Sequence, residues 1–209
     1  FITSREGLDE LYKLTGKEKK EIKNVMILGG SKVGYKTARD LCRNKFNVKL
    51  IEKNKEKAFD LADELPNALI INGDGRNVEL LEEENLEAMD AFVAVTGNSE
   101  TNIMSCLVAK SKNVKKTIAL VENMDYFQLS HSIGIDTLLN KKLLAANNIF
   151  RHIRKGEIVA MTRLNNLNAE ILELIVKQTS QVNGQIIREL EFPREATIGG
   201  VIRDNEGII

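Results

Sequence analysis

A glycine-rich turn between an apolar segment and a helical pattern is the feature of this chain best suited to bind a ligand. The apolar run 24–28 leads into Gly29-Gly-Ser-Lys-Val-Gly34, and helical spacing of apolar residues begins at once. This is the order of parts in a nucleotide-binding β-α-β unit, in which free N–H groups at the helix N-terminus bind a pyrophosphate. Gly29 is expected to permit the tight turn, and Gly34 to let the helix pack closely on the sheet.

A second apolar run, 48–52, ends in an acid. Glu52 lies 23 positions after Gly29, where a carboxylate can accept hydrogen bonds from both ribose hydroxyls and repel a 2′-phosphate. The sequence therefore predicts a bound adenine nucleotide, with NAD(H) favoured over NADP(H).

The central position of the glycine motif departs from the usual G-x-G-x-x-G pattern, because Ser31 stands where the second glycine is expected. That glycine normally lets the backbone approach the phosphates without a side chain in the way. The Ser31 hydroxyl can either bond to a phosphate or crowd it. Two interpretations stay open: a nucleotide site, or a Rossmann unit that has lost its ligand.

The elements that must position these residues repeat along the chain. Apolar runs predict strands at 24–28, 48–52, 68–71, 91–96, 117–121 and 136–139, and helical spacing predicts helices at 55–65, 78–85, 100–112 and 125–133. Ser99 is expected to cap the helix 100–112. Apolar strands that lack polar alternation and are separated by helices indicate a parallel sheet covered on both faces. The predicted fold class is α/β, a doubly wound parallel-sheet Rossmann domain.

The rest of the chain has a different pattern. After an amphipathic helix at 141–155, strand-like runs at 158–164 and 169–176 flank a predicted hairpin turn at 165–168. We expect three parts: 1–21 as the tail of a preceding repeat and a linker, 22–155 as the nucleotide-binding domain, and 156–209 as a small, truncated α+β domain.

The composition excludes several classes of function. The formal net charge is +0, which argues against a general nucleic-acid or anionic-membrane role. Cys42 and Cys106 lack metal-type spacing and are expected to be reduced. Neither His131 nor His152 lies in a known catalytic phrase, and the chain has no Tyr-x-x-x-Lys pair. The sequence therefore predicts a protein that is not an enzyme.

Several stretches resemble the TrkA family, the NAD-binding peripheral subunits of Trk-type potassium uptake systems, which are built from RCK (regulator of potassium conductance) domains. The most specific are VKLIEKN with Glu52, INGDGRN around Asp74, and 91–110 with its phrase Val-Thr-x-x-x-Glu-x-Asn-Ile-Met. The stretches 184–190 and 198–203 resemble the ligand-sensing RCK C-terminal module. The resemblance implies the second repeat of a tandem protein, cut within its last domain.

The resemblance also implies a role. The chain would be a cytoplasmic regulatory subunit, peripheral on the inner face of the cell membrane, that gates a Trk-type potassium-translocating membrane subunit as a homodimer or higher ring assembly. Its cofactor would be NAD(H), with ATP or ADP as alternatives. Residues 29–33 would hold the pyrophosphate, Glu52 the ribose and Asp74 the adenine end, above a floor of Thr96 and Gly97. The full set of candidate cofactor-binding residues is Gly29, Gly30, Ser31, Lys32, Val33, Gly34, Glu52, Lys53, Asp74, Thr96, Gly97 and Asn98.

The chain departs from the family at two positions. Ser31 replaces the central glycine, and Glu122 stands where first-repeat copies tend to carry arginine. Glu122 would repel a phosphate that it faced. Arg76 can be interpreted equally as a phosphate ligand or a solvated loop residue. Two other functions stay open: a small NAD-dependent dehydrogenase, and a structural repeat with an empty pocket.

Overall fold

The computed structural model describes Leu14, Tyr126 and residues 22–123, 134–153, 158–163, 170–203 and 206–208. Residues 22–150 form one compact unit, and the described residues from 151 onward belong to a second. Each unit is treated by itself below. The division predicted at 1–21, 22–155 and 156–209 stays a prediction.

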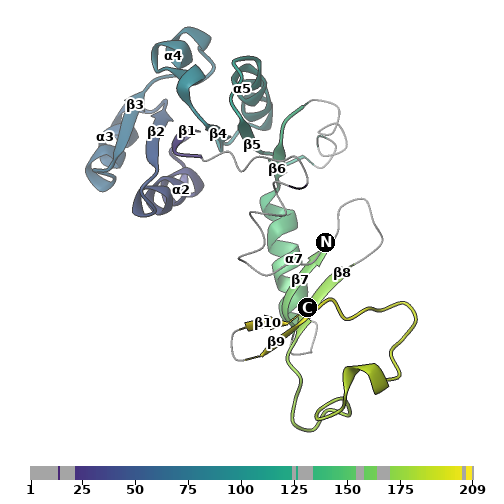
Figure 1. The fold of residues 1–209 in the computed structure, drawn as a ribbon. Coiled ribbons are helices and arrows are strands. Elements are labelled where there is room, and N and C mark those ends of the chain that lie inside the picture. Colours follow the sequence, from purple (N-terminus) through teal and green to yellow (C-terminus); the bar gives the residue numbers. More distant parts are fainter. Residues whose placement is uncertain are drawn as a thin grey trace. The chain divides into compact units, whose positions relative to one another are not determined.

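The first unit is built on a six-stranded sheet in the order β3-β2-β1-β4-β5-β6, and every neighbouring pair is parallel (Figure 1). The strands are β1 (Asn24–Leu28), β2 (Asn47–Glu52), β3 (Ala68–Asn72), β4 (Ala91–Ala94), β5 (Lys116–Leu120) and β6 (Thr137–Leu139). The central strand β1 pairs with β2 on one side and β4 on the other. The chain therefore reverses its direction of travel across the sheet at β1.

Helices cover both faces of this sheet. On one face, α2 (Lys32–Arg43) and α3 (Lys55–Glu64) place Ala38 and Leu61 in a core cluster with Ile27 of β1. On the other, α4 (Val78–Glu83), the 3-10 helix η1 (Leu86–Ala88) and α5 (Ser99–Ser111) pack in a cluster with Met26 and Phe92. Alternate residues of the buried strands thus serve alternate faces. The predicted doubly wound α/β fold is confirmed.

Some predicted boundaries were wrong by a few residues. The run 91–96 yields a strand that ends at Ala94. The expected helix 78–85 ends at Glu83, because Asn85 adopts a left-handed conformation (φ 57°) and starts η1. The predicted helix 125–133 lies, apart from Tyr126, outside the described residues.

Asp90 stabilises the amino end of the sheet, where β1 begins. Its Oδ2 accepts hydrogen bonds from the N–H groups of Lys23 and Asn24, both at 2.9 Å, and its carboxylate pairs with Lys115. The ion pair with Lys115, followed by the two backbone hydrogen bonds, holds the pKa of Asp90 far below its usual range. This carboxylate joins the starts of β1, β4 and β5.

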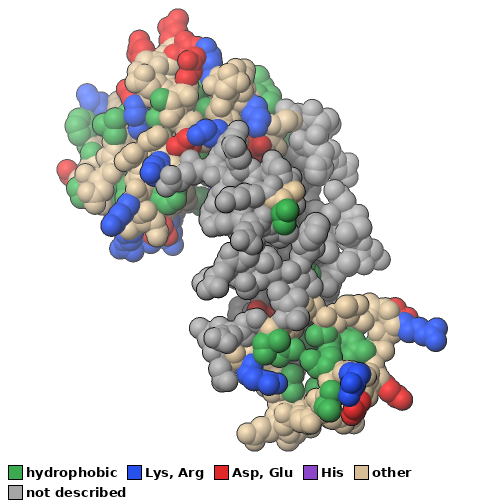
Figure 2. All heavy atoms as spheres, viewed as in Figure 1, with side chains coloured by type: hydrophobic (Ala, Val, Ile, Leu, Met, Phe, Trp, Pro, Cys, Tyr) green, Lys and Arg blue, Asp and Glu red, His purple; other side chains and the backbone are tan. Residues whose placement is uncertain are grey.

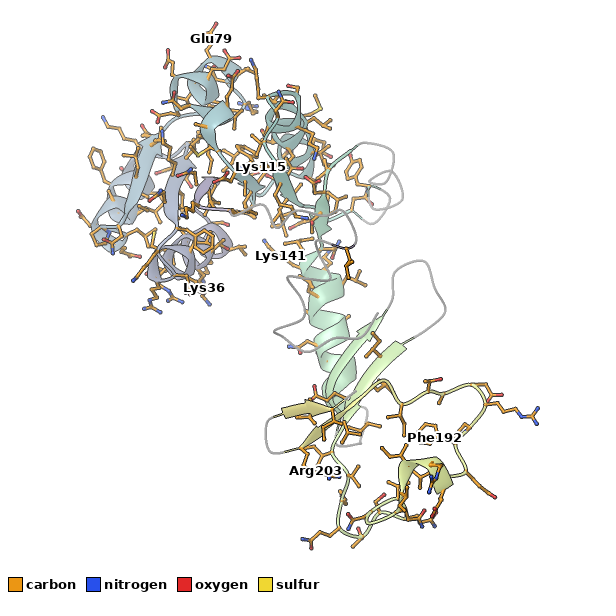
Figure 3. The ribbon with its side chains drawn as sticks, in the orientation of Figure 1. Lys36, Glu79, Lys115, Lys141, Phe192 and Arg203 are labelled. Atoms are coloured by element: carbon orange, nitrogen blue, oxygen red, sulfur yellow. The ribbon has the colours of Figure 1, made fainter. Side chains whose placement is uncertain are left out.

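Charged side chains are distributed unevenly over the first unit. Acidic side chains gather over α4 in the view of Figure 2, and Glu79 projects from that helix in Figure 3. Lys36 projects from α2, which lies on the other face of the sheet (Figure 3). Within the described residues, every helix falls short of the length and apolar character needed to cross a membrane.

The second unit contains two antiparallel strand pairs. After helix α7 (Lys141–Ile153), β7 (Ile158–Arg163) pairs with β8 (Glu170–Leu174), and β9 (Val201–Arg203) pairs with β10 (Glu206–Ile208). A short 3-10 helix, η2, covers Ile187–Glu189. The predicted turn 165–168 lies outside the described residues, but the antiparallel pairing that it implied is present.

Candidate nucleotide-binding site

A cleft of about 460 Å³ opens at the carboxyl ends of β1 to β4. It lies beside β1, where the strand order reverses, which is the usual ligand position in an open parallel sheet. The cleft is lined by Leu28, Gly29, Ser31, Ile51, Glu52, Lys53, Lys57, Gly73, Asp74, Gly75, Arg76, Thr96, Gly97, Asn98 and Thr101. Most of the predicted site residues are therefore brought together.

Two glycines shape the turn between β1 and α2. Gly29 has φ +103°, and a Cβ there would lie 3.0 Å from the backbone nitrogen of Thr96. A Cβ on Gly34 would collide with the carbonyl oxygen of Gly29. The turn and the close approach of α2 to the sheet therefore both require glycine, as predicted.

The first backbone N–H groups of α2 receive no hydrogen-bond acceptor from the side chain of the N-cap residue. Ser31 occupies the N-cap position, but its hydroxyl donates to the carbonyl oxygen of Val95 at 3.1 Å and makes no capping bond. The first turn also contains no acidic residue. Since the first N–H groups of a helix lack intrahelical partners and carry partial positive charge, this end of α2 is suited to an anion.

Glu52 lies beside this helix end and is 9% exposed. Its Oε2 accepts a hydrogen bond from the Gly30 N–H and its Oε1 accepts one from the Asn54 N–H, both at 2.9 Å. The Lys57 ammonium is 3.3 Å from Oε2. Burial raises the pKa of Glu52, but these two backbone donors and Lys57 outweigh it, and the net shift is downward. Glu52 is therefore a carboxylate at neutral pH and borders the cleft.

Asp74 lies across the cleft mouth between two cations. Its Oδ2 is 2.7 Å from the Arg76 guanidinium and 2.9 Å from the Lys53 ammonium. These hydrogen bonds, the one from Arg76 foremost, hold the pKa of Asp74 far below its usual range. Arg76, for which two interpretations were open, thus pairs with Asp74 at the rim of the cleft.

The loop after β4 forms the remaining wall. Thr96, Gly97 and Asn98 all border the cleft. The Asn98 side chain also caps α5, because its Oδ1 accepts a hydrogen bond from the Thr101 N–H at 2.6 Å. The prediction that Ser99 is the cap was wrong: α5 begins one residue earlier, and the Ser99 hydroxyl instead accepts from the Glu122 N–H.

Four predicted residues lie behind or outside the cleft lining. The Gly30 N–H is given to Glu52, Lys32 is exposed, Val33 packs against the core, and Gly34 is buried under the turn. Glu122 is exposed and does not border the cleft.

Sequence reasoning missed Lys57 as a cleft residue. Lys57 lies in the first turn of α3, directly after the strand that carries Glu52. A strand, a short turn and a helix bring such a residue back beside the strand end, so its position was a usable signal.

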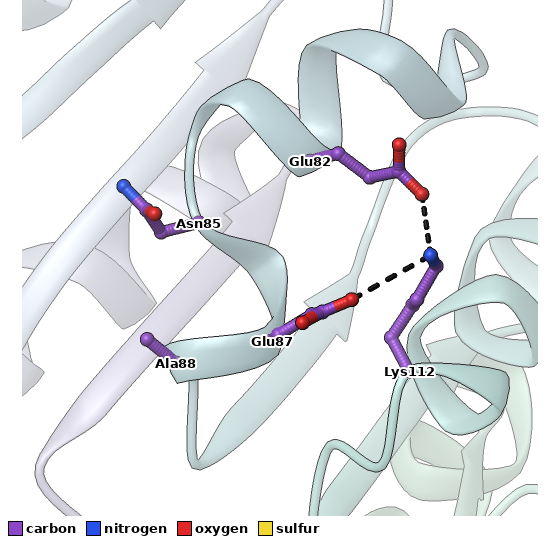
Figure 4. Close-up of a pocket in the computed structure, with 5 residues that line it drawn as sticks. All are labelled: Glu82, Asn85, Glu87, Ala88 and Lys112. Atoms are coloured by element: carbon purple, nitrogen blue, oxygen red, sulfur yellow. Dashed lines mark ion pairs between the residues drawn. The ribbon is translucent and has the colours of Figure 1, made fainter.

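A second hollow, of about 500 Å³, lies between η1 and the C-terminal end of α5 and contains none of the candidate residues (Figure 4). Lys112 pairs there with both Glu82 and Glu87.

The part of the chain that the structure describes holds no cluster of residues able to bind a metal ion. Cys42 and Cys106 are free thiols, and burial raises the pKa of Cys106 to about 12.

Comparisons with known proteins agree with this architecture. The TrkA-N domain family matches residues 25–141. The chain is 34% identical to the Trk system potassium uptake protein TrkA of Vibrio alginolyticus over 208 residues, which is 98% of this chain and 44% of that protein. It is also 34% identical to the Haemophilus influenzae protein of the same name, over 100% of this chain and 46% of the relative. The chain thus spans about half the length of the curated relatives it matches.

Solved structures share the fold. The TrkA-N domain of the inner membrane protein ybaL from Escherichia coli superposes with a TM-score of 0.58 at 15% identity, over 65% of this chain and 99% of that one. The GsuK channel bound to NAD superposes with a TM-score of 0.55 at 17% identity, over 70% of this chain and 26% of that one. From the matched domain, the whole-length similarity and the shared fold, the chain belongs to the TrkA family and carries its TrkA-N, RCK-type domain.

Proposed function

We propose that this chain is the nucleotide-sensing part of a Trk-type potassium uptake protein, and that the cleft beside β1 binds NAD(H) or another adenine nucleotide. The observation that carries the proposal is the pairing of two features in one cleft. The uncapped start of α2 suits a pyrophosphate, and the Glu52 carboxylate beside it suits a ribose. Among structural relatives, one GsuK structure is bound to NAD and another to ADP.

The residues present fit such a ligand. The cleft volume of about 460 Å³ falls within the range of small-molecule sites. In this proposal residues 29–33, with the first amides of α2 rather than the Gly30 N–H that donates to Glu52, hold the phosphates, and Glu52 holds the ribose hydroxyls. Asp74, with Lys53, borders the adenine end. Thr96, Gly97 and Asn98 form the wall after β4.

Glu52 also sets the expected preference among dinucleotides. Its lowered pKa keeps it ionised at neutral pH. A 2′-phosphate placed on the ribose would meet this negative charge, so we propose that NAD(H) binds more tightly than NADP(H).

The proposed mechanism requires no chemical reaction. Nucleotide binding would shift an equilibrium between conformations of a larger assembly, and the difference in affinity between them would be the regulatory signal. We propose that the chain acts as a homodimer or higher ring on the inner face of the cell membrane, against a potassium-translocating subunit. Two relatives are named as Trk system potassium uptake proteins, which supports the assignment of this chain to such a system. Within this proposal, 22–155 is the RCK N-terminal domain and 156–209 belongs to the RCK C-terminal domain.

Isothermal titration with NADH, NAD, NADPH, ATP and ADP tests this function. We expect saturable binding of NADH or an adenine nucleotide, with NADPH weaker than NADH, and no consumption of NADH in the presence of electron acceptors. Titrations without heat for all five ligands would support a structural repeat with an empty pocket. Substrate-dependent oxidation of NADH would support an enzyme instead.

Glu52→Gln is the sharpest variant for this site. It keeps the shape of the side chain and removes its charge, so we expect NADH binding to weaken by about 1–3 kcal/mol, as when charged hydrogen bonds are lost. The difference in affinity between NADH and NADPH should also become smaller. Glu84→Gln is the matched control, because Glu84 pairs with Lys49 outside the cleft lining. Equal NADH affinity in Glu52→Gln and wild type would show that the Glu52 charge does not contribute to NADH binding.

A further inference from the structure

The side-chain amide of Asn102 stands directly behind one wall of the cleft and is 1% exposed. Its Oδ1 accepts hydrogen bonds from the Thr96 N–H at 3.0 Å and from the Thr96 hydroxyl at 2.6 Å. Its Nδ2 donates to the carbonyl oxygens of Thr96 at 3.1 Å and of Leu120 at 2.8 Å. An asparagine amide has two donor hydrogens and two acceptor lone pairs, so every one of them is used.

These bonds tie together the ends of two neighbouring strands. Thr96 follows β4 and Leu120 ends β5. Asn102 lies in the first turns of α5 and does not border the cleft itself. A single buried side chain therefore holds the backbone after β4, on both its N–H and C=O sides, against the end of β5.

The position of Thr96 matters because it faces the glycine turn. A Cβ on Gly29 would lie 3.0 Å from the Thr96 nitrogen, so the two walls of the cleft are in close contact there. The Ser31 hydroxyl joins the same walls through Val95, the residue before Thr96. A displacement of Thr96 would be transmitted to the turn that precedes α2.

We infer that Asn102 is a positioning residue for the nucleotide site: its amide fixes the Thr96 backbone and so sets the spacing between the loop after β4 and the glycine turn. This inference rests on the proposed function, because it concerns the affinity of the same cleft. It goes beyond it in assigning part of that affinity to a residue that touches no ligand.

A purely structural role for Asn102 makes a different prediction, and Thr117 provides the comparison. Thr117 is 0% exposed, and its hydroxyl donates to Asp136 Oδ2 at 2.8 Å and accepts from the Asp136 N–H at 3.2 Å. It lies near the amino end of β5, whereas the cleft opens at the carboxyl ends of the strands. Loss of its hydroxyl should therefore reduce stability without altering the cleft.

The test compares Asn102→Leu with Thr117→Val by thermal unfolding and by titration with NADH well below both melting temperatures. Both variants should melt at a lower temperature than wild type. Asn102→Leu should bind NADH about tenfold more weakly or worse, whereas Thr117→Val should match wild type. Equal affinity in Asn102→Leu and wild type overturns the inference. If wild type binds another adenine nucleotide instead of NADH, the same comparison is made with that nucleotide. Absence of binding of NADH, NAD, NADPH, ATP and ADP by wild type overturns the proposed function itself, and the inference with it.

A measurement on the wild-type protein decides the matter if Asn102→Leu does not fold. Hydrogen exchange of the Thr96 backbone amide and of the Asn102 side-chain amide is followed by NMR with and without NADH. NADH should slow exchange at both groups and leave the Thr117 amide unchanged. Exchange rates at Thr96 and Asn102 that stay constant while NADH binds would overturn the inference.

Discussion

The helices α2 and α5 begin at the carboxyl ends of the neighbouring strands β1 and β4 and border the same cleft, but their first turns differ. In α5, Asn98 accepts a hydrogen bond from the Thr101 N–H, and Glu100 adds a negative charge. In α2, the Ser31 hydroxyl donates to the carbonyl oxygen of Val95, and the first turn contains no acidic residue. The chain satisfies the start of α5 with its own side chains. The start of α2 lacks such a capping bond, and there we propose that the anion binds.

Other helices of the chain follow the pattern of α5. The side chains of Asn54, Asn77 and Asn140 accept hydrogen bonds from first-turn N–H groups of α3, α4 and α7. Asparagine at these positions is a strong N-cap. Among the α-helix starts in the described residues, α2 thus differs in having an N-cap side chain that makes another contact and no capping bond. This difference places the proposed phosphate position at α2.

Among the variants considered, replacement of Gly34 by alanine should have the largest effect on stability and on NADH binding. The new Cβ would meet the Gly29 carbonyl oxygen, so α2 must move away from the turn. We expect the free energy of unfolding to fall by about 3 kcal/mol and NADH binding to be lost. Gly97→Ala is a control for stability alone, since no atom lies within 4 Å of a Cβ there but the residue borders the cleft. Denaturant unfolding of both variants and titration of Gly34→Ala with NADH check the prediction, and a Gly34→Ala variant with wild-type affinity would contradict it.

Asp90 allows a test at the opposite end of the sheet. Asp90→Asn should lower the free energy of unfolding at neutral pH by about 2 kcal/mol, because charged hydrogen bonds to Lys23 and Asn24 are lost. The affinity for NADH should stay that of wild type, because Asp90 does not border the cleft. A loss of affinity would show that the two ends of the sheet are not independent.

The same residue gives a pH dependence of defined sign. The pKa of Asp90 is lower in the folded protein than its ordinary value, so its stabilisation is complete above about pH 4 and is lost as the pH falls below that. The difference in unfolding free energy between wild type and Asp90→Asn should therefore shrink on acidification. Urea unfolding at neutral pH and near pH 3 measures it. A difference that grows towards acid pH would be inconsistent with this role.

Ser31→Gly should have the smallest effect. The change restores the glycine motif but removes the hydrogen bond to Val95, so we expect a loss of about 1 kcal/mol in stability. Because the hydroxyl is committed to Val95, NADH affinity should change by no more than a few-fold. Titration and thermal unfolding of the variant check this. A large gain in affinity would mean that the Ser31 side chain crowds the phosphates.

Much of the fold could be predicted from local pattern. Buried parallel strands consist of apolar runs such as 24–28 and 48–52. The turn between β1 and α2 requires glycine at positions 29 and 34, where any side chain would be strained or would collide. The misplaced boundaries have local causes that a pattern does not reveal. The left-handed conformation of Asn85 ended α4 early, and the choice of Asn98 over Ser99 as cap depended on where α5 begins.

The site was predicted less completely than the fold, because its details depend on contacts between distant segments. The acceptor of the Ser31 hydroxyl, Val95, lies 64 positions away, directly after another strand. Asn102 was part of a distinctive phrase, but its role depends on the carbonyl oxygen of Leu120. Both contacts exist only once β1, β4 and β5 lie side by side, so no pattern within one segment indicates them.

We propose that the start of α2, and not that of α5, receives the phosphates of an adenine nucleotide. Titration of isotope-labelled protein with NADH, followed by amide-detected NMR, tests it directly. If the phosphates bind there, the largest shifts should occur at the backbone amides of residues 30–34 and of Glu52, with small shifts at Thr101 and Asn102. Large shifts at the start of α5, with the amides of 30–34 unchanged, would contradict it.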